Sequence, residues 1–521
     1  MEEFKVLITT SGIGSRLGEL TNYTNKSLIR IGKKPAISYI IENYPPETNF
    51  VITLGYYGNQ VKDFLELAYP EKKFEFVLVE NFSGNGSSLG WSMLCAKNNL
   101  QCPFIYHASD TLVFEEIPVP EKNWIIGCKK ENTSNYRTIK KGNKFKIYDK
   151  GQLENDNLCY IGVCGIKDYN LFWNSLDLAH EENKLNNQLC DCDGINKMNL
   201  DFDIVEFNSW LDIGSSSELK EARHKIYDKF EILDKVDESI FLFNDFVIKF
   251  FFDKKLCKNR VKRCDLLDGL TPKIIDFKDN FYKYEHAKGD LLSDIVNDEI
   301  FESFLFWSKE NLWKKNGEKN LNFKKSCEDF YFNKTKSRVE NYLKINNLKD
   351  EKSIINKTEV PSVFELLNLI SKDWICDAEP YQFHGDYILD NVLYQGKSKF
   401  VLLDWRQDFS NSLIHGDIYY DLAKMNHNLI INHKIVHKKL YNINYENNEI
   451  FCDILCSKRL IDCQKILHNF ILKNGMDLKK VEILTSIIWL NMSPLHEYPL
   501  NDFLFNFGKI NLYKQLKKYE S

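Results

Sequence analysis

The sequence predicts an α/β protein in two parts, a doubly wound parallel sheet followed by a two-lobed α+β region. The first 110 residues alternate apolar strands with amphipathic helices, beginning with a strand at 5–9, which is the pattern of parallel βαβ units. After about residue 235 the pattern changes to paired strands and then to long helical segments. With 521 residues, the chain is long enough for two or three domains.

Composition excludes several classes of protein. A hydrophobic content of 43% and a charged content of 27% are ordinary for a soluble globular protein. The net charge of -5 offers no basic field for nucleic acid, so we expect small-molecule partners and no nucleic acid. The most apolar run, at 239–252, is interrupted by Asn244, Asp245 and Lys249, so we expect no membrane span. The short apolar run near the N-terminus does not suit a secretion signal, and we expect a cytoplasmic protein.

The chain has 14 cysteines and no Cys-x-x-Cys pair. Cys190 and Cys192 are close in sequence, as are Cys452 and Cys456, but no histidines cluster beside them. We therefore expect reduced structural thiols rather than metal ligands.

A glycine-containing turn follows the first strand. It contains Gly12, Gly14, Ser15 and Arg16, and Lys26 comes ten residues later. Glycines let backbone N–H groups approach a polyphosphate closely, and an arginine can bind the pyrophosphate that leaves. Taken alone, this pattern suits either a phosphate site or an ordinary turn.

The longer run resembles a known signature. The strand, the Gly-x-Gly-Ser-Arg turn, NKSL at 25–28 and GKKPAISYII at 32–41 together resemble the sugar-phosphate nucleotidylyltransferases. The resemblance covers residues 1 to about 225 and implies a Rossmann-like domain at 1–228. It further implies transfer of a nucleotide from CTP, GTP, UTP or dTTP. The family usually has alanines where this chain has Thr9, Thr10 and Ser11, which leaves the base open.

Two aspartates are candidate Mg²⁺ ligands in this domain. Asp110 ends an apolar strand, where a carboxylate is either a solvated turn residue or a metal ligand. The resemblance implies the second role, with Asp212 of the WLDIG segment as the other ligand. Two carboxylates can hold one Mg²⁺ against the α-phosphate of a nucleotide.

The resemblance also nominates substrate contacts. Lys150 in IYDKG resembles the family's lysine beside the substrate phosphate, although a lysine on a solvated face is the simpler interpretation. Gly162 lies in the strand that would wall the substrate side. Gly86 and Ser88 are candidates for contact with the base.

The second part, 235–521, is predicted to comprise a small lobe (235–290) and a large lobe (291–521). Two apolar strands open the small lobe, and Lys249 lies in the second of them. The strand pair, the basic helix and the strand that follows resemble the small lobe of a kinase, which implies that Lys249 is the phosphate-binding lysine. A lysine in an apolar strand is also costly to bury away from an edge.

The strongest motif of the chain is FHGDYILDNVLY, which is followed by the strand KFVLLDWRQDF. Asp386 precedes Asn391 by five residues, and the strand ends at Asp404. This arrangement positions a hydroxyl and binds Mg²⁺ in kinases. Asp386 would orient and deprotonate the acceptor hydroxyl, Asn391 and Asp404 would bind the metal, and His384 would brace the loop.

With GDIYYDLAK at 416–424, the second part resembles the aminoglycoside phosphotransferase and choline kinase superfamily. The resemblance covers about 235–521 and implies a protein-kinase-like fold that uses ATP. Two features depart from it. No glycine occurs between Gly214 and Gly269, and Asp265 is the best acidic partner for Lys249. The helices expected at 311–360 would belong to the acceptor pocket.

Together the two parts predict a bifunctional kinase and nucleotidylyltransferase that makes an NDP-sugar for a surface polysaccharide. One alternative is choline kinase and CTP:phosphocholine cytidylyltransferase chemistry, which would make a CDP-aminoalcohol. Another is that one half binds or regulates without catalysis. A homo-oligomer is expected by analogy only. The sequence leaves open the base, the acceptor, the oligomeric state, channelling and the pathway.

Overall fold

Strand β1 (Lys5–Thr9) is the centre of the first sheet in the computed structural model. The structure describes residues 3–140, 145–152, 157–182, 189–226, 235–317 and 321–519. Packing divides the chain into unit 1 (Met1–Cys257 and Ile275–His286) and unit 2 (Lys258–Ile274 and Ala287–Ser521). Each unit is described by itself.

The main sheet of unit 1 is parallel in its middle and antiparallel beyond. Its strands follow the order β10-β9-β11-β6-β1-β4-β5, with β8 beside β11 and β12 beside β8. β1 pairs in parallel with β4 and β6, and β4 pairs in parallel with β5, so the predicted βαβ core is confirmed. β11 runs antiparallel to β6 and β8, which makes the sheet mixed rather than wholly parallel. The strands are β2 (Arg30–Ile31), β3 (Lys34–Pro35), β4 (Asn49–Leu54), β5 (Lys73–Leu78), β6 (Phe104–Ala108), β7 (Thr111–Leu112), β8 (Trp124–Cys128), β9 (Thr138–Lys140), β10 (Lys146–Tyr148), β11 (Leu158–Ile166), β12 (Asp203–Phe207) and β13 (Leu211–Asp212).

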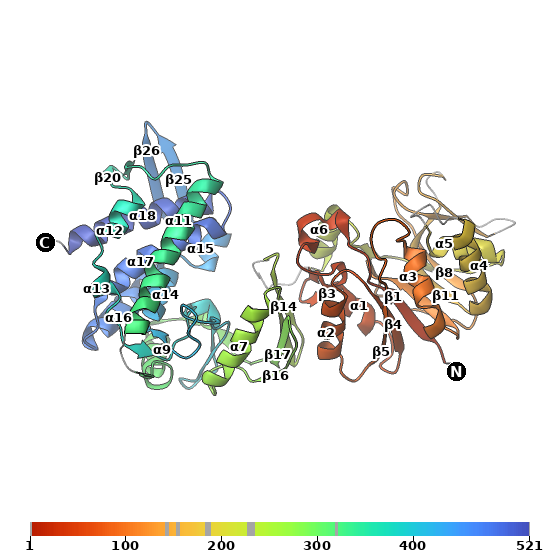
Figure 1. Ribbon diagram of the computed structural model, residues 1–521, viewed down its shortest axis with the longest axis horizontal. Helices are drawn as coiled ribbons and strands as arrows, with labels where there is room; N and C mark the ends of the chain where they lie inside the picture. Colours follow the sequence, from red (N-terminus) through yellow and green to blue (C-terminus); the bar gives the residue numbers. More distant parts are fainter. Residues whose placement is uncertain are drawn as a thin grey trace. The chain divides into compact units, whose positions relative to one another are not determined.

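Helices cover both faces of this sheet, as a doubly wound fold requires. Val6 and Ile8 of β1 join the core formed with α1 and α2, whereas Leu7 joins the core formed with α3, α4 and α5. α4 and α5 lie together beside β8 and β11 (Figure 1). The helices are α1 (Ala36–Glu42), α2 (Gly58–Ala68), α3 (Leu89–Cys95), α4 (Tyr169–Glu182), α5 (Asp191–Met198) and α6 (Ser216–Lys225), with short helices η1 (Ser15–Thr21), η2 (Lys26–Leu28) and η3 (Lys97–Asn99).

A smaller sheet packs against α2 within unit 1. Its order is β14-β15-β17-β16, and the predicted antiparallel pair with a turn at Asn244-Asp245 is confirmed. Phe64 of α2 contacts the rings of Phe241 and Phe281, with centroids 5.4 and 6.1 Å apart. The strands are β14 (Glu238–Leu242), β15 (Phe246–Phe251), β16 (Ile274–Phe277) and β17 (Phe281–Glu285).

Two lysines of this sheet also bind α2. Lys283 donates to the carbonyl of Leu67 at 2.9 Å, and Lys278 pairs with Glu66 at 2.9 Å. These contacts place the sheet in unit 1. The sequence predicted a domain boundary between 228 and 235. That boundary stays a prediction. Helix α7 (Lys254–Leu266) begins in unit 1 and ends in unit 2.

Unit 2 is mainly helical, with α17 packed against α14 and α18. The helices predicted near the C-terminus are confirmed as α16 and α17. The helices are α8 (Leu292–Ile295), α9 (Asp298–Asn311), α10 (Leu321–Glu328), the π-helix η4 (Asp329–Asn333), α11 (Lys334–Ile345), α12 (Val363–Asn368), α13 (Lys372–Ile375), η5 (Leu389–Asn391), α14 (Ile418–Ile430), α15 (His433–His437), α16 (Lys458–Lys473), α17 (Leu478–Met492), η6 (Ser493–Leu495) and α18 (Leu500–Lys518).

One part of the predicted helical insertion is a sheet. The segment expected to be helical at 311–360 ends in two short strands, β19 and β20. They adopt this conformation because β19 pairs with β26, which lies about 95 residues later in the chain. The strands of unit 2 are β18 (Asp290–Leu291), β19 (Ser353–Ile355), β20 (Thr358–Val360), β21 (Pro380–Tyr381), β22 (Val392–Tyr394), β23 (Phe400–Leu402), β24 (Gly416–Asp417), β25 (Tyr441–Glu446) and β26 (Glu449–Ile454).

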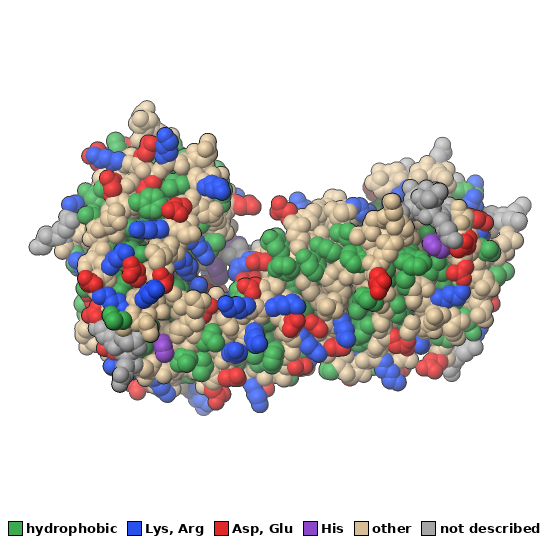
Figure 2. All heavy atoms as spheres, viewed as in Figure 1, with side chains coloured by type: hydrophobic (Ala, Val, Ile, Leu, Met, Phe, Trp, Pro, Cys, Tyr) green, Lys and Arg blue, Asp and Glu red, His purple; other side chains and the backbone are tan. Residues whose placement is uncertain are grey.

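The surface and the cysteines are unremarkable for a globular protein. Acidic and basic side chains are interspersed on the face that Figure 2 shows. All 14 cysteines are free thiols, most of them buried. Among the described residues, no helix has the length and apolarity to cross a membrane.

The contact between α2 and the small sheet predicts a measurable loss of stability. Phe64→Ala should lower the free energy of unfolding by about 3–5 kcal/mol, because it leaves a cavity between Phe241 and Phe281. Phe277→Ala is the matched control, since Phe277 is 52% exposed on β16, and should cost less than about 1 kcal/mol. Urea unfolding followed by tryptophan fluorescence measures both changes. Equal losses in the two variants would contradict this account of the packing.

Candidate functional site

The predicted phosphate turn has the backbone that its glycines suggest. Gly14 caps η1 with a φ of 72°, a left-handed conformation that favours glycine. A Cβ at Gly14 would also lie 3.0 Å from the Cβ of Lys26. Gly12 has no atom within 4 Å of the place where a Cβ would be. The turn is therefore open at Gly12 and held against Lys26 at Gly14.

Asn25 fixes the position of Lys26 relative to the turn. Its buried side-chain amide donates to the carbonyls of Thr10, at 2.8 Å, and Tyr56, at 2.6 Å. Its side-chain oxygen accepts hydrogen bonds from the backbone N–H and the hydroxyl of Ser27. One side chain therefore ties together the end of β1, the segment after β4 and the start of η2. This role was not predicted, although the NKSL segment contained the residue.

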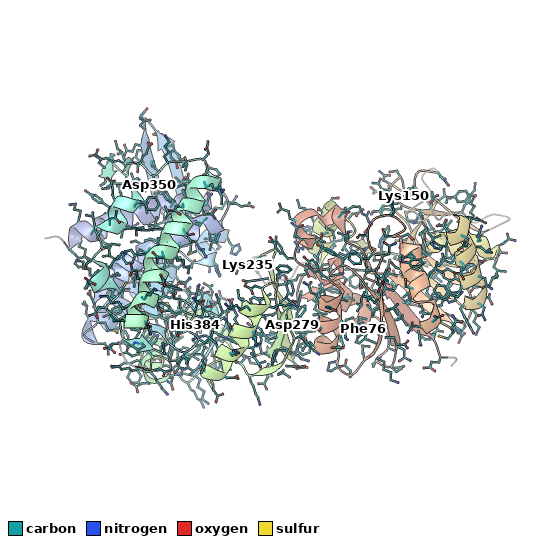
Figure 3. The ribbon with its side chains drawn as sticks, in the orientation of Figure 1. Phe76, Lys150, Lys235, Asp279, Asp350 and His384 are labelled. Carbon is teal, nitrogen blue, oxygen red and sulfur yellow. The ribbon has the colours of Figure 1, made fainter. Side chains whose placement is uncertain are left out.

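The predicted residues of unit 1 converge on one cavity of about 670 Å³. Gly12 and Asp110 follow the carboxyl ends of β1 and β6, where ligands bind in sheets of this type. Lys150 is exposed and is labelled in Figure 3. Eight predicted residues line the cavity: Gly12, Arg16, Lys26, Ser88, Asp110, Lys150, Gly162 and Asp212.

Three other predicted residues do not line this cavity. Gly14 and Ser15 form the turn at the edge of the cavity. Gly86 lies two residues before Ser88. The Ser88 side chain caps α3 by accepting a hydrogen bond from the N–H of Trp91 at 3.0 Å. Gly86 has a φ of 82°, so it supplies the bend that precedes α3. The roles predicted for all of these residues in binding stay predictions.

Asp110 and Asp212 are brought together by a short antiparallel pair. β13 pairs with β7, so Asp212 lies opposite Thr111, and the N–H of Ile213 donates to the carbonyl of Asp110 at 3.0 Å. Lys26 Nζ lies 3.1 Å from Asp110 Oδ2. The cavity therefore has two converging carboxylates with a lysine beside them.

The charges of this pair act on each other. Burial favours a raised pKa for Asp110, but the nearby Lys26 ammonium and Arg16 guanidinium bring that pKa below its ordinary value. Burial, together with the negative charges of Asp110 and Glu218, raises the pKa of Asp212 to about 6. Oxygen ligands whose charges repel are the donor set that Mg²⁺ accepts, so the two aspartates fit the predicted metal.

Several residues in or beside the cavity were not predicted as site residues from the sequence. The ammonium of Lys130 lies 4.2 Å from the ring centroid of Tyr136 and 4.8 Å from that of Trp210. The Tyr136 hydroxyl donates to Glu218 at 2.7 Å. Tyr136, Trp210 and Glu218 all line the cavity, as does Arg137. Only the tryptophan had a signal in the sequence, as part of the WLDIG segment.

In unit 2, Asp421 holds the loop that contains the strongest motif. It accepts the backbone N–H groups of His384, at 2.8 Å, and Gly385, at 2.7 Å, and the indole N–H of Trp313 at 3.2 Å. Burial raises the pKa of Asp421 to about 6, although these donors oppose the shift. The His384 ring bonds the carbonyl of Leu403 at 2.8 Å, as a bracing residue would (Figure 3).

Asp386 is paired with a lysine that the sequence analysis did not identify as a site residue. Lys424 Nζ lies 2.8 Å from Asp386 Oδ1, and the Asn391 amide donates to Asp386 Oδ2 at 3.1 Å. Burial favours a raised pKa for Asp386, but the Lys424 ammonium lowers it to about 2. Asp386 is therefore an ionised carboxylate that faces the amide of Asn391. The sequence feature that could have identified Lys424 is its position as the last residue of the GDIYYDLAK segment.

Asp404 lies at the end of β23 with a φ of 54° and forms an ion pair with Arg260 of α7. The N–H of Leu403 donates to the carbonyl of Asn391 at 2.7 Å, which ties the two predicted metal ligands together through the backbone. Lys249 is buried in β15 of unit 1, and Asp265, its predicted partner, is exposed on α7. The metal-binding role of Asp404 and the phosphate-binding role of Lys249 stay predictions.

Comparisons with known proteins concern part of the chain. No known protein-family profile matches it. A probable glucose-1-phosphate cytidylyltransferase of Bacillus subtilis (strain 168) is 33% identical over 88 residues. This match spans 16% of the chain and about a third, 34%, of the length of that curated relative.

Two solved structures align with a larger share of the chain. A CTP:phosphocholine cytidylyltransferase from Streptococcus pneumoniae is 18% identical with a TM-score of 0.36, and the alignment covers 43% of this chain and 99% of that one. A putative glucose-1-phosphate thymidylyltransferase from Bacillus anthracis is 16% identical with a TM-score of 0.38, over 45% of this chain and 98% of that one. The assignment of the fold of unit 1 rests on the strand order described above.

The hydrogen bonds of Asn25 predict a second change in stability. Asn25→Ala should lower the free energy of unfolding by about 2–3 kcal/mol, because it leaves the buried carbonyls of Thr10 and Tyr56 without donors. Asn22→Ala is the control, since Asn22 is exposed three residues earlier, and should change stability by less than about 0.5 kcal/mol. Midpoints of urea unfolding give both values. An Asn25→Ala protein as stable as the control would show that these bonds do not hold the turn.

Proposed function

We propose that the chain is a bifunctional enzyme that phosphorylates a small hydroxyl compound and then transfers a nucleoside monophosphate to the phosphorylated product. The observation that carries the proposal is the cavity of unit 1, where Arg16 and Lys26 face the carboxylates of Asp110 and Asp212. Cations for phosphates beside paired carboxylates for a metal are what nucleotidyl transfer requires.

In unit 1 the open backbone at Gly12, with Arg16 and Lys26, binds the triphosphate of the nucleotide. Asp110 and Asp212 would hold Mg²⁺, which would neutralise charge on the α-phosphate. A phosphate oxygen of the substrate bonds to the α-phosphorus while the bond from that phosphorus to the β-phosphate oxygen breaks. Arg16 and Lys26 then face the charge of the departing pyrophosphate. CTP, GTP, UTP and dTTP all remain candidates for the nucleotide.

In unit 2 Asp386 orients the acceptor hydroxyl and takes its proton as that oxygen bonds to the γ-phosphorus of ATP and ADP leaves. Lys424 keeps Asp386 ionised and in place. Asn391 and Asp404 would hold the Mg²⁺ of this half, which would neutralise charge on the phosphates, and Arg260 forms an ion pair with Asp404. In this proposal Lys249 binds the phosphates of ATP.

The favoured product is an NDP-sugar for surface glycan synthesis. The long signature of the first 225 residues resembles sugar-phosphate enzymes, and the 33% identical relative is named for glucose 1-phosphate. Lys150 and Gly162 would contact the sugar phosphate, and Ser88 with the bend at Gly86 would contact the base. A cytoplasmic location and a homo-oligomer belong to the same proposal.

A second candidate product is a CDP-aminoalcohol. The observation in its favour is the pair of aromatic rings, Tyr136 and Trp210, beside Glu218 in the cavity of unit 1. These rings already hold the Lys130 ammonium, so an aminoalcohol head group would bind there by displacing that side chain. A non-catalytic role for one half is an outcome that the following experiments distinguish.

Each half should be inactivated without the other. Asp110→Asn should lower pyrophosphate release from an NTP and a supplied phosphorylated substrate by at least about 100-fold, while sparing ATP-dependent phosphorylation. Asp386→Asn should do the reverse, because it removes the base of unit 2 only. Coupled pyrophosphate and ADP assays measure the two activities on the full chain.

Exposed Asp201 is the control for these two variants, and Asp201→Asn should retain both activities. Loss of both activities in Asp386→Asn, with its unfolding midpoint unchanged, would refute independent sites. Unchanged pyrophosphate release in Asp110→Asn would remove that residue from the metal site. If one half of the wild-type protein shows no activity with any of the nucleotides and acceptors tested, that half would have a binding or regulatory role.

The two candidate products differ in their dependence on Trp210. If the product is a CDP-aminoalcohol, Trp210→Leu should raise the KM for phosphocholine by at least about 10-fold, since it removes one face of the aromatic pair. If the substrate is a sugar 1-phosphate, wild-type protein should release no pyrophosphate with phosphocholine. It should release pyrophosphate with one sugar phosphate and one nucleotide. Pyrophosphate release decides between the two products when CTP, GTP, UTP, dTTP and ATP are each tested with sugar 1-phosphates and with phosphocholine.

A further inference from the structure

Unit 2 contains a second cavity, of about 120 Å³, that lies beside Asp386. Helices α11, α14 and α17 line it, together with η4, η6 and the segment after β23. Lys424 belongs to its lining and also bonds Asp386, so one end of the cavity adjoins the carboxylate assigned to the acceptor hydroxyl.

Four basic side chains line this small cavity: Lys334, Arg338, Arg406 and Lys424. Lys424 is neutralised by Asp386. Arg338 donates to the backbone carbonyl of Asn491 at 3.1 Å, and Arg406 donates to that of Asp408 at 3.0 Å, but neutral carbonyls do not cancel a charge. Within the described part of the chain, no carboxylate oxygen lies within 4.0 Å of a side-chain nitrogen of Lys334, Arg338 or Arg406.

Holding these cations together is costly for the protein alone. Burial, then the charges of Arg406, Arg338 and Lys424, lower the pKa of Lys334 to about 6, although Asp408 acts in the opposite direction. The ring of Phe330, 4.1 Å from the Lys334 ammonium, offers only partial compensation. A bound anion would relieve this repulsion, and strongly perturbed basic groups in a cavity are candidates for a functional site.

The rest of the lining is apolar and amide-bearing. Ile487 and Ile488 of α17, with Met492, supply an apolar wall. Asn491 presents an amide whose oxygen is buried without a hydrogen-bond partner among the described residues. Aromatic residues come from η4, a π-helical segment between α10 and α11, and such segments are frequent at functional sites.

We propose that unit 2 phosphorylates a hydroxyl compound that carries its own anionic group, a carboxylate, phosphonate or phosphate, and that Arg338, Arg406 and Lys334 bind this group. This inference rests on the proposed kinase activity and specifies its substrate class. Guanidinium groups bind such anions through paired charge-assisted hydrogen bonds. Neutral sugars would leave the cluster unpaired, and choline would be repelled by it.

The anion that the cluster binds could also be a phosphate of ATP. The position of the cavity favours the acceptor, because Lys424 joins it to Asp386, whereas Asn391, Asp404 and Arg260 do not line it. The test below separates the two sources by measuring KM for each substrate.

Matched acceptors test the proposal on the full chain with Mg²⁺ and ATP. The pairs are glucose with glucuronate, galactose with galacturonate and glycerol with glycerate, with choline added. At least one anionic member should be phosphorylated with kcat/KM at least about 10-fold above its neutral partner and above choline. Arg338→Gln and Arg406→Gln should each raise KM for that acceptor by about 10-fold or more and leave KM for ATP within about 2-fold.

Lys344→Gln is the matched control, because Lys344 is an exposed cation on the same helix as Lys334 and Arg338, and it should change neither constant. A raised KM for ATP in the arginine variants, with KM for the acceptor unchanged, would overturn the proposal and assign the cluster to the nucleotide. Preferred phosphorylation of a neutral acceptor or choline would overturn it while leaving the kinase activity in place.

Calorimetry without ATP measures anion binding by the cluster independently of phosphate transfer by unit 2. Glucuronate, glycerate and inorganic phosphate are titrated into wild-type protein, Arg338→Gln and Lys344→Gln. Binding by the wild type and Lys344→Gln that is weakened at least about 10-fold in Arg338→Gln supports an anion site even if the kinase proposal fails. Equal binding by all three proteins, or none, overturns the site.

Discussion

A partly buried carboxylate is costly without a cation beside it, and three ion pairs of this kind lie in the two candidate sites. Asp110 has Lys26, Asp386 has Lys424, and Asp404 has Arg260. Without these partners each carboxylate would lose hydration that nothing replaces. The same cations are what a phosphate group needs when it enters. The ion pairs therefore stabilise the folded sites and are also able to exchange one anionic partner for another.

Hydrogen bonds between buried side chains and the backbone hold the loops of both sites in place. Asn25 ties three chain segments around Lys26, and Asp421 gathers two backbone N–H groups of the loop before Asp386. Both side chains are buried and make most of the hydrogen bonds available to them. A buried polar group with satisfied partners permits one arrangement only, because any shift leaves a donor or acceptor unpaired. The backbone of the charged residues is therefore held in place by bonds that do not involve their own charges.

Local signals in the sequence were sufficient for the frame of unit 1 and for much of its cavity. Hydrophobic periodicity predicted β1, β4, β5 and β6 with their helices, and parallel strands necessarily end at one edge, so Arg16 and Asp110 had to meet there. Long-range pairing was not readable. The antiparallel β11, the packing of the small sheet on α2 and the pairing of β19 with β26 depend on contacts between distant segments. The cations of unit 2 were missed for the same reason, since Arg338 and Arg406 meet only in the folded chain.

A compound that passes from unit 2 to unit 1 has to be recognised twice, so the charges of the two cavities constrain it together. The aromatic pair in unit 1 is the feature that favours a cationic head group, yet it already contains the ammonium of Lys130. An incoming ammonium would have to expel that lysine, whereas an anion would find Lys150 lining the same cavity, with Arg137 in an ion pair with Asp149. In unit 2 the uncompensated charge is positive. An anionic acceptor therefore satisfies both cavities with the chain's own cations in place, and a cationic acceptor satisfies neither without rearrangement.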